Sequence, residues 1–264
     1  GVGPFAIEDG LVAARDPVTS VRIHNVNTGA LVEARVQTPG GAVTYEGTTS
    51  IPGVSGTAAP VALRFHRIAG GCSGALFPTG QRQERIGDVP VTLLDCATAV
   101  MLVPAASLGA DMAAGPEALR ADTALRARIE ALRLEAGRRM GFGDVSDRVL
   151  PKPVLIGAAT DADLTVRYFT PWEVHRALAV TGGIAIAAAI HLPGTVAAEL
   201  AGTRAPGAAI RLRHPAGILE IMLESDGTDI AWAEVTRTAR RLFEGKVLVP
   251  AGIWNQTETV RRAA

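Results

Sequence analysis

The sequence predicts an α+β fold with two lobes. Runs of β-branched and aromatic residues that favour strands recur along most of the chain. Two apolar helices that contain glycine are also expected, at 1–14 and 175–190, each with its own set of strands. This repeated order divides the chain into a first lobe at 1–105 and a second lobe at 106–240, with their central helices facing each other. The last residues, 241–264, are expected to return to the first lobe.

The first helix is indicated by apolar Val2, Phe5 and Ile7, which precede the acidic pair before Gly10. The pattern is typical of the back half of an apolar helix. Because the chain opens with Gly1 inside this pattern, we expect the first lobe to be incomplete at its N-terminus.

Strands dominate the rest of the first half. Two of them, at 21–26 and 31–37, flank Asn27-Thr28-Gly29, which favours a hairpin turn. Further strands are expected at 42–47, 61–66, 89–95 and 100–104, with glycine-rich loops at 51–60 and 71–80.

A clear helix opens the second half. Pro116 and Glu117 favour its first turn, and Gly137 is a plausible end. One apolar face runs along it at helical spacing, made by Leu125, Ile129, Leu132 and Ala136. Strands are then expected at 152–158 and 164–169, and after the second central helix at 210–214, 217–224, 230–235 and 247–250.

The second central helix is the most distinctive element. It follows the strand that ends before Thr170-Pro171, and it stops before Pro193. Its uncharged run, 177–190, has 14 residues, short of the roughly 20 that span a membrane. A helix that is apolar on every face is buried, and its glycines can let another backbone approach. Its N-terminal end can also hold an anion such as a carboxylate, because unpaired N–H groups and the positive end of the dipole lie there.

Composition and charge exclude several classes of protein. Hydrophobic residues make up 48% of the chain, and 26 basic residues balance 26 acidic ones. A net charge of zero argues against nucleic acid or an anionic membrane surface as a partner. The two cysteines, Cys72 and Cys96, have no zinc-ligand spacing and make no disulfide scaffold, so a cytoplasmic location is expected. Nothing nearby activates either thiol. Because no metal cluster, nucleotide loop or flavin motif is visible, no cofactor is expected.

Several stretches, spread over nearly the whole chain, resemble the PrpF family of isomerases. This family includes methylaconitate isomerase, aconitate delta-isomerase, methylitaconate isomerase and 4-oxalomesaconate tautomerase. The matching stretches are GVGPFAIEDGLVAA (1–14), VRIHNVNTG (21–29), QTPGGAVTYEG (37–47), GVSGTAAP (53–60), LFPTG (76–80), MGFGDVS (140–146), RYFTPWEVHRALAVTGG (167–183) and RTARRLFEG (237–245). The resemblance implies a diaminopimelate-epimerase-like fold, in which each lobe is a mixed β-barrel around a central helix.

The resemblance also implies a chemistry, which is a 1,3-proton shift that moves a double bond in an unsaturated di- or tricarboxylate. A base removes a proton beside a carboxylate or carbonyl, and an acid returns it at the other end of the allyl system. Enolate charge develops in between, so the site needs hydrogen-bond donors. The expected partner is a small-molecule polycarboxylate such as 4-oxalomesaconate, methylaconitate or aconitate; a homodimer is allowed, but the sequence leaves the oligomer open.

Candidate substrate-binding residues lie in two of the matching stretches. Arg167 is the best candidate for a carboxylate clamp, with a structural ion pair as the alternative. His175 would orient the substrate or cap the helix. Backbone N–H groups of Thr181, Gly182 and Gly183 could bind an anion, although these residues are expected beyond the first turn. Thr79 and Gly80 are candidates for lining the other lobe.

The acid and base themselves are expected upstream of Gly1. In the family a catalytic Lys and an Asn-Cys-Gly-Asn motif precede the stretch that matches 1–14. A two-base epimerase of the same fold would need a second thiol near His175, and no cysteine is present there. The alternative to an enzyme is a non-catalytic carboxylate-binding or accessory protein without the acid–base pair.

Overall fold

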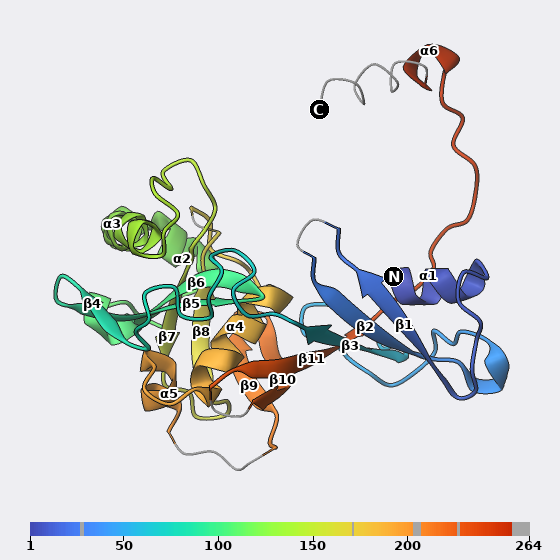
Figure 1. Cartoon of the computed structure of the whole chain (residues 1–264), viewed down its shortest axis with the longest axis horizontal. Helices are drawn as coiled ribbons and strands as arrows, with labels where there is room; N and C mark the ends of the chain where they lie inside the picture. The colour runs from blue at the N-terminus through green and yellow to red at the C-terminus, as the bar shows by residue number, and fades with distance from the viewer. Residues whose placement is uncertain (27–28, 171, 203–206, 226–227, 255–264) are drawn as a thin grey trace.

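The computed structural model describes residues 1–26, 29–170, 172–202, 207–225 and 228–254. Its strands form one 11-stranded sheet in the order β1-β2-β3-β11-β10-β9-β8-β7-β6-β5-β4. The sheet curls into two lobes, with α1 beside the first and α4 inside the second (Figure 1). The predicted α+β class is therefore confirmed.

The first lobe is a three-stranded antiparallel sheet with a short helix on one face. Its elements are α1 (Val2–Glu8), β1 (Val18–His24), β2 (Leu31–Gln37), the 3-10 turn η1 (Pro39–Gly41) and β3 (Pro60–His66). Gly3 of α1 lies so close to β2 that an added Cβ would be 2.9 Å from Val36. A small apolar core joins helix and sheet, made by Ala6, Ile7, Val21, Ala34, Val36 and Val61.

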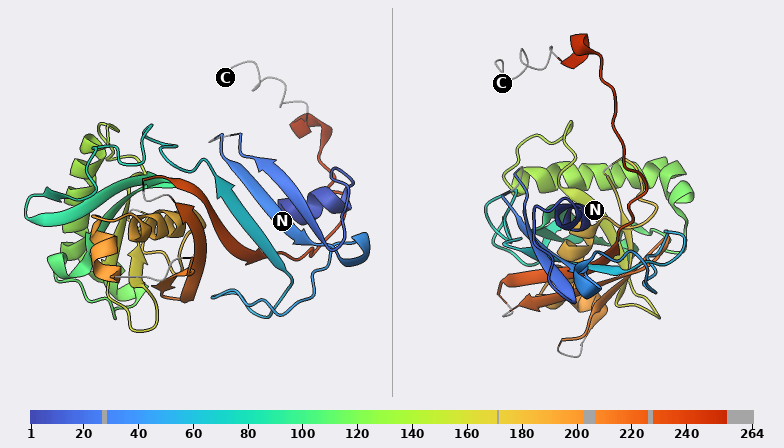
Figure 2. Two further views of the ribbon diagram at one scale, coloured as in Figure 1. Left: turned by 60° about the horizontal axis from the view of Figure 1, so that its bottom comes forward. Right: turned by 90° about the vertical axis from the view of Figure 1, so that its right-hand side faces the viewer.

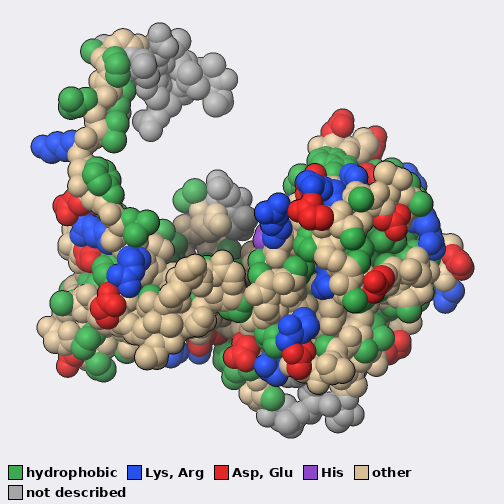
Figure 3. Space-filling view, turned by 180° about the vertical axis from the view of Figure 1, so that it is seen from behind, with side chains coloured by type: hydrophobic (Ala, Val, Ile, Leu, Met, Phe, Trp, Pro, Cys, Tyr) green, Lys and Arg blue, Asp and Glu red, His purple; other side chains and the backbone are tan. Residues whose placement is uncertain are grey.

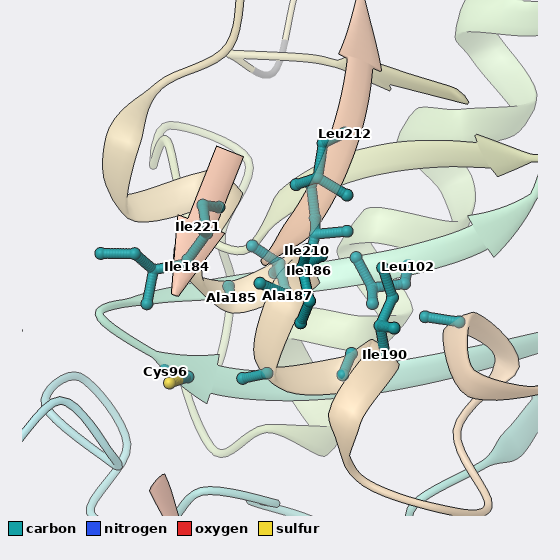
Figure 4. Packing of buried hydrophobic residues seen from close by; sticks show 14 of the residues in the cluster. Cys96, Leu102, Ile184, Ala185, Ile186, Ala187, Ile190, Ile210, Leu212 and Ile221 are labelled. Carbon is teal, nitrogen blue, oxygen red and sulfur yellow. The ribbon is translucent and has the colours of Figure 1, made fainter. Parts of the chain in front are cut away.

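The second lobe wraps strands around α4 (Val180–His191). The strands are β4 (Glu84–Ile86), β5 (Val89–Cys96), β6 (Thr98–Pro104), β7 (Lys152–Gly157), β8 (Leu164–Tyr168), β9 (Ile210–His214) and β10 (Gly217–Ser225). All residues of α4 from Gly182 to Ile190 are buried. Their neighbours come from most of the surrounding strands, and Figure 4 shows Leu102, Ile210, Leu212 and Ile221 facing the helix.

A second layer covers the outer face of β5–β7. It contains the 3-10 turn η2 (Ala105–Leu108), α2 (Pro116–Ala121) and α3 (Thr123–Arg139), and a separate apolar cluster lies beneath α3. The predicted apolar face of α3 is confirmed, because Leu125, Ile129, Leu132 and Ala136 are all buried. The helix expected from residue 116 is two helices, because Asp122 ends α2 and its side chain accepts a hydrogen bond from the Leu125 N–H.

One strand joins the two lobes. β11 (Ile230–Thr238) pairs with β3 on one side and with β10 on the other. In Figure 2 this strand runs from the wall around α4 into the sheet of the first lobe. Its buried residues Ala233 and Val235 belong to the cluster around α4.

The lobes meet at a different place in the chain from the predicted one. β4, β5 and β6 all precede residue 105, the expected end of the first lobe, yet β5 and β6 pack against α4. The change from the first core to the second falls near Ile68, which already belongs to the α4 cluster.

The segment after β11 leaves the body of the molecule. Arg240 and Arg241 hold its start to the first lobe through Glu46 and Glu8, at 3.0 and 3.1 Å. Beyond them the chain extends away to α6 (Ala251–Trp254), as Figure 3 shows. The predicted strand at 247–250 is wrong, because this segment pairs with no described strand and Leu248 is 93% exposed. A return of 241–264 to the first lobe stays a prediction, and 255–264 lie outside the described residues.

Of the remaining predictions of strands and helices, some are confirmed and others are wrong. The hairpin of β1 and β2 is confirmed, although its turn at 27–28 lies outside the described residues. The strand at 42–47 is wrong, since these residues pair with no neighbouring strand. Sequence reasoning missed β4 and α5 (Val196–Ala201).

Candidate functional site

Helix α4 begins at Val180, five residues later than the sequence predicts. Ala179 is the N-cap, and the first backbone hydrogen bond runs from the Gly183 N–H to the Ala179 carbonyl at 2.8 Å. Thr181 and Gly182 therefore lie in the first turn, where N–H groups have no partner within the helix. These two residues can offer the anion-binding groups that we expected further inside the helix.

Close packing holds this end of α4 in place. A Cβ at Gly182 would lie 2.2 Å from Cε2 of Tyr168, and a Cβ at Gly183 would lie 2.6 Å from a methyl group of Leu219. Only glycine allows the helix to approach β8 and β10 this closely. The glycines therefore have a packing role, whatever ligand the helix end holds.

His175 lies just before α4 and not inside it. Its N–H donates to the Tyr168 carbonyl at 2.8 Å, next to the bridge between Phe169 and Val174 that follows strand β8. Its Nδ1 accepts a hydrogen bond from the Ala177 N–H at 3.0 Å. The imidazole stands edge-on to the Tyr168 ring, with 6.2 Å between ring centroids.

His214 lies at the end of β9 and is 6% exposed. Burial, followed by the charges of Arg237, His175, Arg213 and Arg167, lowers its pKa to about 4. The charges of several basic groups from different segments therefore act on one buried imidazole. Such a concentration of positive charge favours a ligand that carries more than one negative charge.

Arg237 lies near the end of β11 and lines a groove. The groove has a volume of about 490 Å³ and lies against the loop 49–52. Burial lowers the pKa of Arg237, and among the described residues only the Thr236 carbonyl accepts a hydrogen bond from its guanidinium. Leu219 lines the same groove, and its side chain packs on Gly183 of α4. We call this the β10–β11 groove.

Arg167 points to the opposite face of the sheet from α4. Its guanidinium donates to the carbonyls of Ala114, Met112 and Val166, so it fastens the segment before α2 to β8. Burial lowers its pKa. No ion pair of Arg167 is formed with the described residues, and its role as a carboxylate clamp stays a prediction.

Thr79 and Gly80 lie at the other end of α4. Thr79 donates to Glu84 at 2.6 Å, and the neighbouring Arg82 donates to the carbonyl of Pro193, beyond the helix C-terminus. A helix of 12 residues is about 18 Å long. The structure therefore does not bring these two residues together with His175, and a role for them in binding also stays a prediction.

Sequence reasoning missed His214 and Arg237. Arg237 falls in a matching stretch but is one of several arginines there, and only its burial distinguishes it. His214 had one readable signal, because His214-Pro215-Ala216 repeats the His-x-Ala order of His175-Arg176-Ala177.

Neither of the two cysteines belongs to the candidate site. Cys96 is fully buried, and burial and Asp95 raise its pKa. Cys72 is on an exposed loop held by Asp95, whose Oδ2 accepts hydrogen bonds from the N–H groups of Cys72 and Ser73. Partial burial and the Asp95 charge also raise the Cys72 pKa, so both thiols are less reactive than a free cysteine.

Neither a metal cluster nor a membrane-spanning helix is found in the part of the chain that the structure describes. The described residues contain no group of three or more His, Cys, Asp or Glu side chains placed to hold a metal ion. Within that same part of the chain, none of the helices has the length and apolar character needed to cross a membrane.

The buried His214 is expected to make stability depend on pH. Its pKa is about 4 in the folded chain, against an ordinary value of 6.5. Between these values the unfolded chain binds more protons, so stability falls as the pH is lowered through this window and is fully present above it. The loss is at most about 3 kcal/mol. Urea unfolding at pH 7 and pH 5 should show a smaller loss for His214→Gln than for the wild type, with His24→Gln as the exposed control. An equal loss in all three proteins would contradict the assignment.

Comparison with known proteins identifies the family. The model of the PrpF protein family matches residues 1–250. The putative isomerase YbhH of Escherichia coli (strain K12) is 51% identical over 253 residues, which cover 95% of this chain and 72% of that protein. The 4-oxalomesaconate tautomerase of Pseudomonas putida is 39% identical, and the match covers 98% of this chain and 72% of that protein.

A solved structure agrees with this result. The crystal structure of a methylitaconate-delta-isomerase superposes with a TM-score of 0.85 at 28% identity, over 94% of this chain and 70% of that chain. The expected family and fold are thus confirmed by sequence and by structure. This chain belongs to the PrpF protein family.

Proposed function

We propose that this chain is an isomerase that moves a double bond in an unsaturated di- or tricarboxylate by a 1,3-proton shift, without a cofactor. The observation that carries the proposal is that Arg237 and His175, which precedes α4, both act electrostatically on the buried His214. The names of the relatives, a 4-oxalomesaconate tautomerase and a methylitaconate isomerase, support the same class of reaction.

Each group has a task in binding such a substrate. Arg237 can hold one carboxylate through two parallel N–H···O bonds, because its guanidinium lines the groove and engages only one carbonyl of the described residues. The first-turn N–H groups of α4 can hold a second carboxylate at the positive end of the helix dipole. Two carboxylates fixed at separate points orient the carbon chain between them, which lowers the entropic part of the barrier to proton transfer.

The finer parts of the proposal concern substrate and setting. Oxalomesaconate is the leading candidate, with methylaconitate and aconitate as further ones. We further propose that the protein is located in the cytoplasm, that it forms a homodimer and that it binds no nucleic acid.

Arg237→Gln is expected to weaken binding of trans-aconitate by about 10- to 100-fold, since a hydrogen bond to a charged group contributes roughly 1.5–3 kcal/mol. Isothermal calorimetry on the whole chain measures this without requiring turnover. Arg240→Gln is the matched control, because Arg240 is close in sequence but pairs with Glu46 at the surface. Equal affinity in both variants would place the carboxylate site elsewhere.

A proton-exchange assay then separates an enzyme from a binding protein. The chain is incubated with trans-aconitate or 4-oxalomesaconate in deuterated water and followed by NMR. Deuterium at the allylic position supports the isomerase. Binding without exchange supports the second candidate, a non-catalytic carboxylate-binding protein.

A further inference from the structure

The connection between η1 and β3 contains a loop with few attachments. Its base is closed at Thr49 and Ala58, whose backbones exchange two hydrogen bonds of 3.1 and 3.0 Å. Between them, the only hydrogen bond formed with described residues is internal, from the Val54 N–H to the Ile51 carbonyl at 2.9 Å. All residues from Gly53 to Thr57 are exposed, and none carries a charge. We call residues 49–58 the 49–58 loop.

The tip of this loop reaches the second lobe. A Cβ built on Gly217 would lie 2.7 Å from Cβ of Pro52. A Cβ built on Gly53 would lie 3.2 Å from Cβ of Ala216. Both contacts fall on the hairpin between β9 and β10, where the Ala216 N–H donates to Nδ1 of the buried His214 at 3.2 Å. The loop of the first lobe therefore rests on the turn that holds His214.

The same loop forms one side of the β10–β11 groove. Residues 49–52 line the groove on that side, and Arg237 is among the residues that line it from the sheet. Pro52 is thus both a part of the groove wall and the residue that contacts Gly217. If the tip leaves the hairpin, the groove loses this wall.

We propose that the 49–58 loop is a latch that responds to ligand: it docks on the β9–β10 hairpin to complete the groove, and a bound polycarboxylate holds it there. This inference rests on the proposed function, because it takes the groove as the substrate site. A segment with few contacts, exposed backbone and no ion pair among the described residues opens at little cost in free energy.

Such a latch links ligand affinity to the position of the loop. A ligand that contacts the wall binds the docked form better, so it shifts the population toward that form. The apparent affinity is reduced by the fraction of molecules whose loop is undocked. Fixing the loop on the hairpin should therefore strengthen binding without adding any contact to the ligand.

Hydrogen exchange of the full chain, followed by NMR, tests the motion. The amide groups of Thr49, Val54 and Ala58 report on it, because their hydrogen bonds close the base and the tip of the loop. In the free chain they should exchange faster than the paired amides in the middle of β3. Saturating trans-aconitate should slow them by at least about tenfold, since it holds the loop docked.

A disulfide across the contact tests the link to affinity. Gly53→Cys with Ala216→Cys places two Cβ atoms 3.2 Å apart, within a few tenths of an ångström of the roughly 3.5–4.5 Å found in disulfides. The exposed Cys72 is changed to serine to prevent wrong pairing. In calorimetry the oxidised protein should bind trans-aconitate about three- to tenfold more tightly than the same protein after reduction. Any strain of a cysteine at position 53 is common to both forms.

Two glycine variants separate the contact from loop flexibility. Pro52→Gly removes the contact with Gly217 and should weaken binding of trans-aconitate about three- to tenfold. Val54→Gly is the matched control, because it loosens the same loop at a residue that is 58% exposed and lies outside the groove lining. Its affinity should stay closer to that of the wild type.

The possible failures are distinguishable. Equal or weaker affinity in the oxidised protein, with the disulfide verified by mass, would overturn the latch and leave the proposed function intact. The same holds if the two cysteines do not pair, if trans-aconitate leaves the three amides unchanged, or if both glycine variants lose affinity equally. No calorimetric binding of trans-aconitate or 4-oxalomesaconate to the wild type would overturn the proposed function, and the latch with it.

Discussion

Replacing Arg133 with methionine is expected to lower the free energy of unfolding by about 3–5 kcal/mol, the range for breaking a buried ion pair. Arg133 lies on α3, and its side chain is fully buried. It binds both carboxylate oxygens of Glu130 at 2.7 Å and donates to the carbonyls of Val145, Arg148 and Leu150. Methionine fills much of the volume but leaves all these acceptors without their donor.

The same helix provides a matched control. Arg138 pairs with Glu135 at the same three-residue spacing, but its side chain is 62% exposed. Exposed pairs contribute about 0–1 kcal/mol, so Arg138→Met should change stability little. Urea unfolding of both variants measures the difference. Similar losses would mean that the carbonyls of 145–150 find other partners and that burial does not determine the effect.

Alanine at Gly182 is expected to destabilise the chain by about 1–3 kcal/mol, the usual cost of overpacking a core. The added methyl group would meet the ring of Tyr168 at 2.2 Å, and this ring is only 3% exposed. Either the ring or the first turn of α4 must move. Movement of the helix would also shift the N–H groups of Thr181 and Gly182, so weaker binding of trans-aconitate is expected as well.

Thermal unfolding and calorimetry measure both effects of this change. Thr181→Ala is the neighbouring control, because Thr181 is partly exposed. If steric overlap is the cause, Gly182→Ala should cost less when Tyr168 has been changed to alanine than in the wild-type background. Additive losses in that double variant would rule out the contact with Tyr168 as the reason.

Regular patterns could be predicted from the sequence, whereas features that depend on distant partners could not. The apolar face of α3 and the charge-free run of α4 follow from local spacing. The segment 42–47 has strand-like residues but forms no strand, because its backbone hydrogen bonds to Gln37 and Ala59 build no regular ladder.

In the candidate site, too, local features could be predicted from the sequence and long-range ones could not. The helix that carries Thr181 and Gly182 could be located from the sequence, although its first residue could not, because Val174 before it pairs with Phe169 at the end of β8. The direction of the Arg167 side chain follows from its place in β8. Val166 and Tyr168 both face α4, so side-chain alternation directs Arg167 to the other face. Arg237 and His214 come from separate strands, and only the fold brings them together.

The shared strand β11 has a consequence for how this protein can change. Residues of β11 pair with β3 in the first lobe, and two of these same residues, Ala233 and Val235, fill the core of the second. The lobes are therefore not modules that can be exchanged, duplicated or expressed separately, since any cut between them removes a wall from one or an edge partner from the other. Variation that keeps the molecule intact is confined to the loops and outer helices, and the two lobes must evolve as one unit.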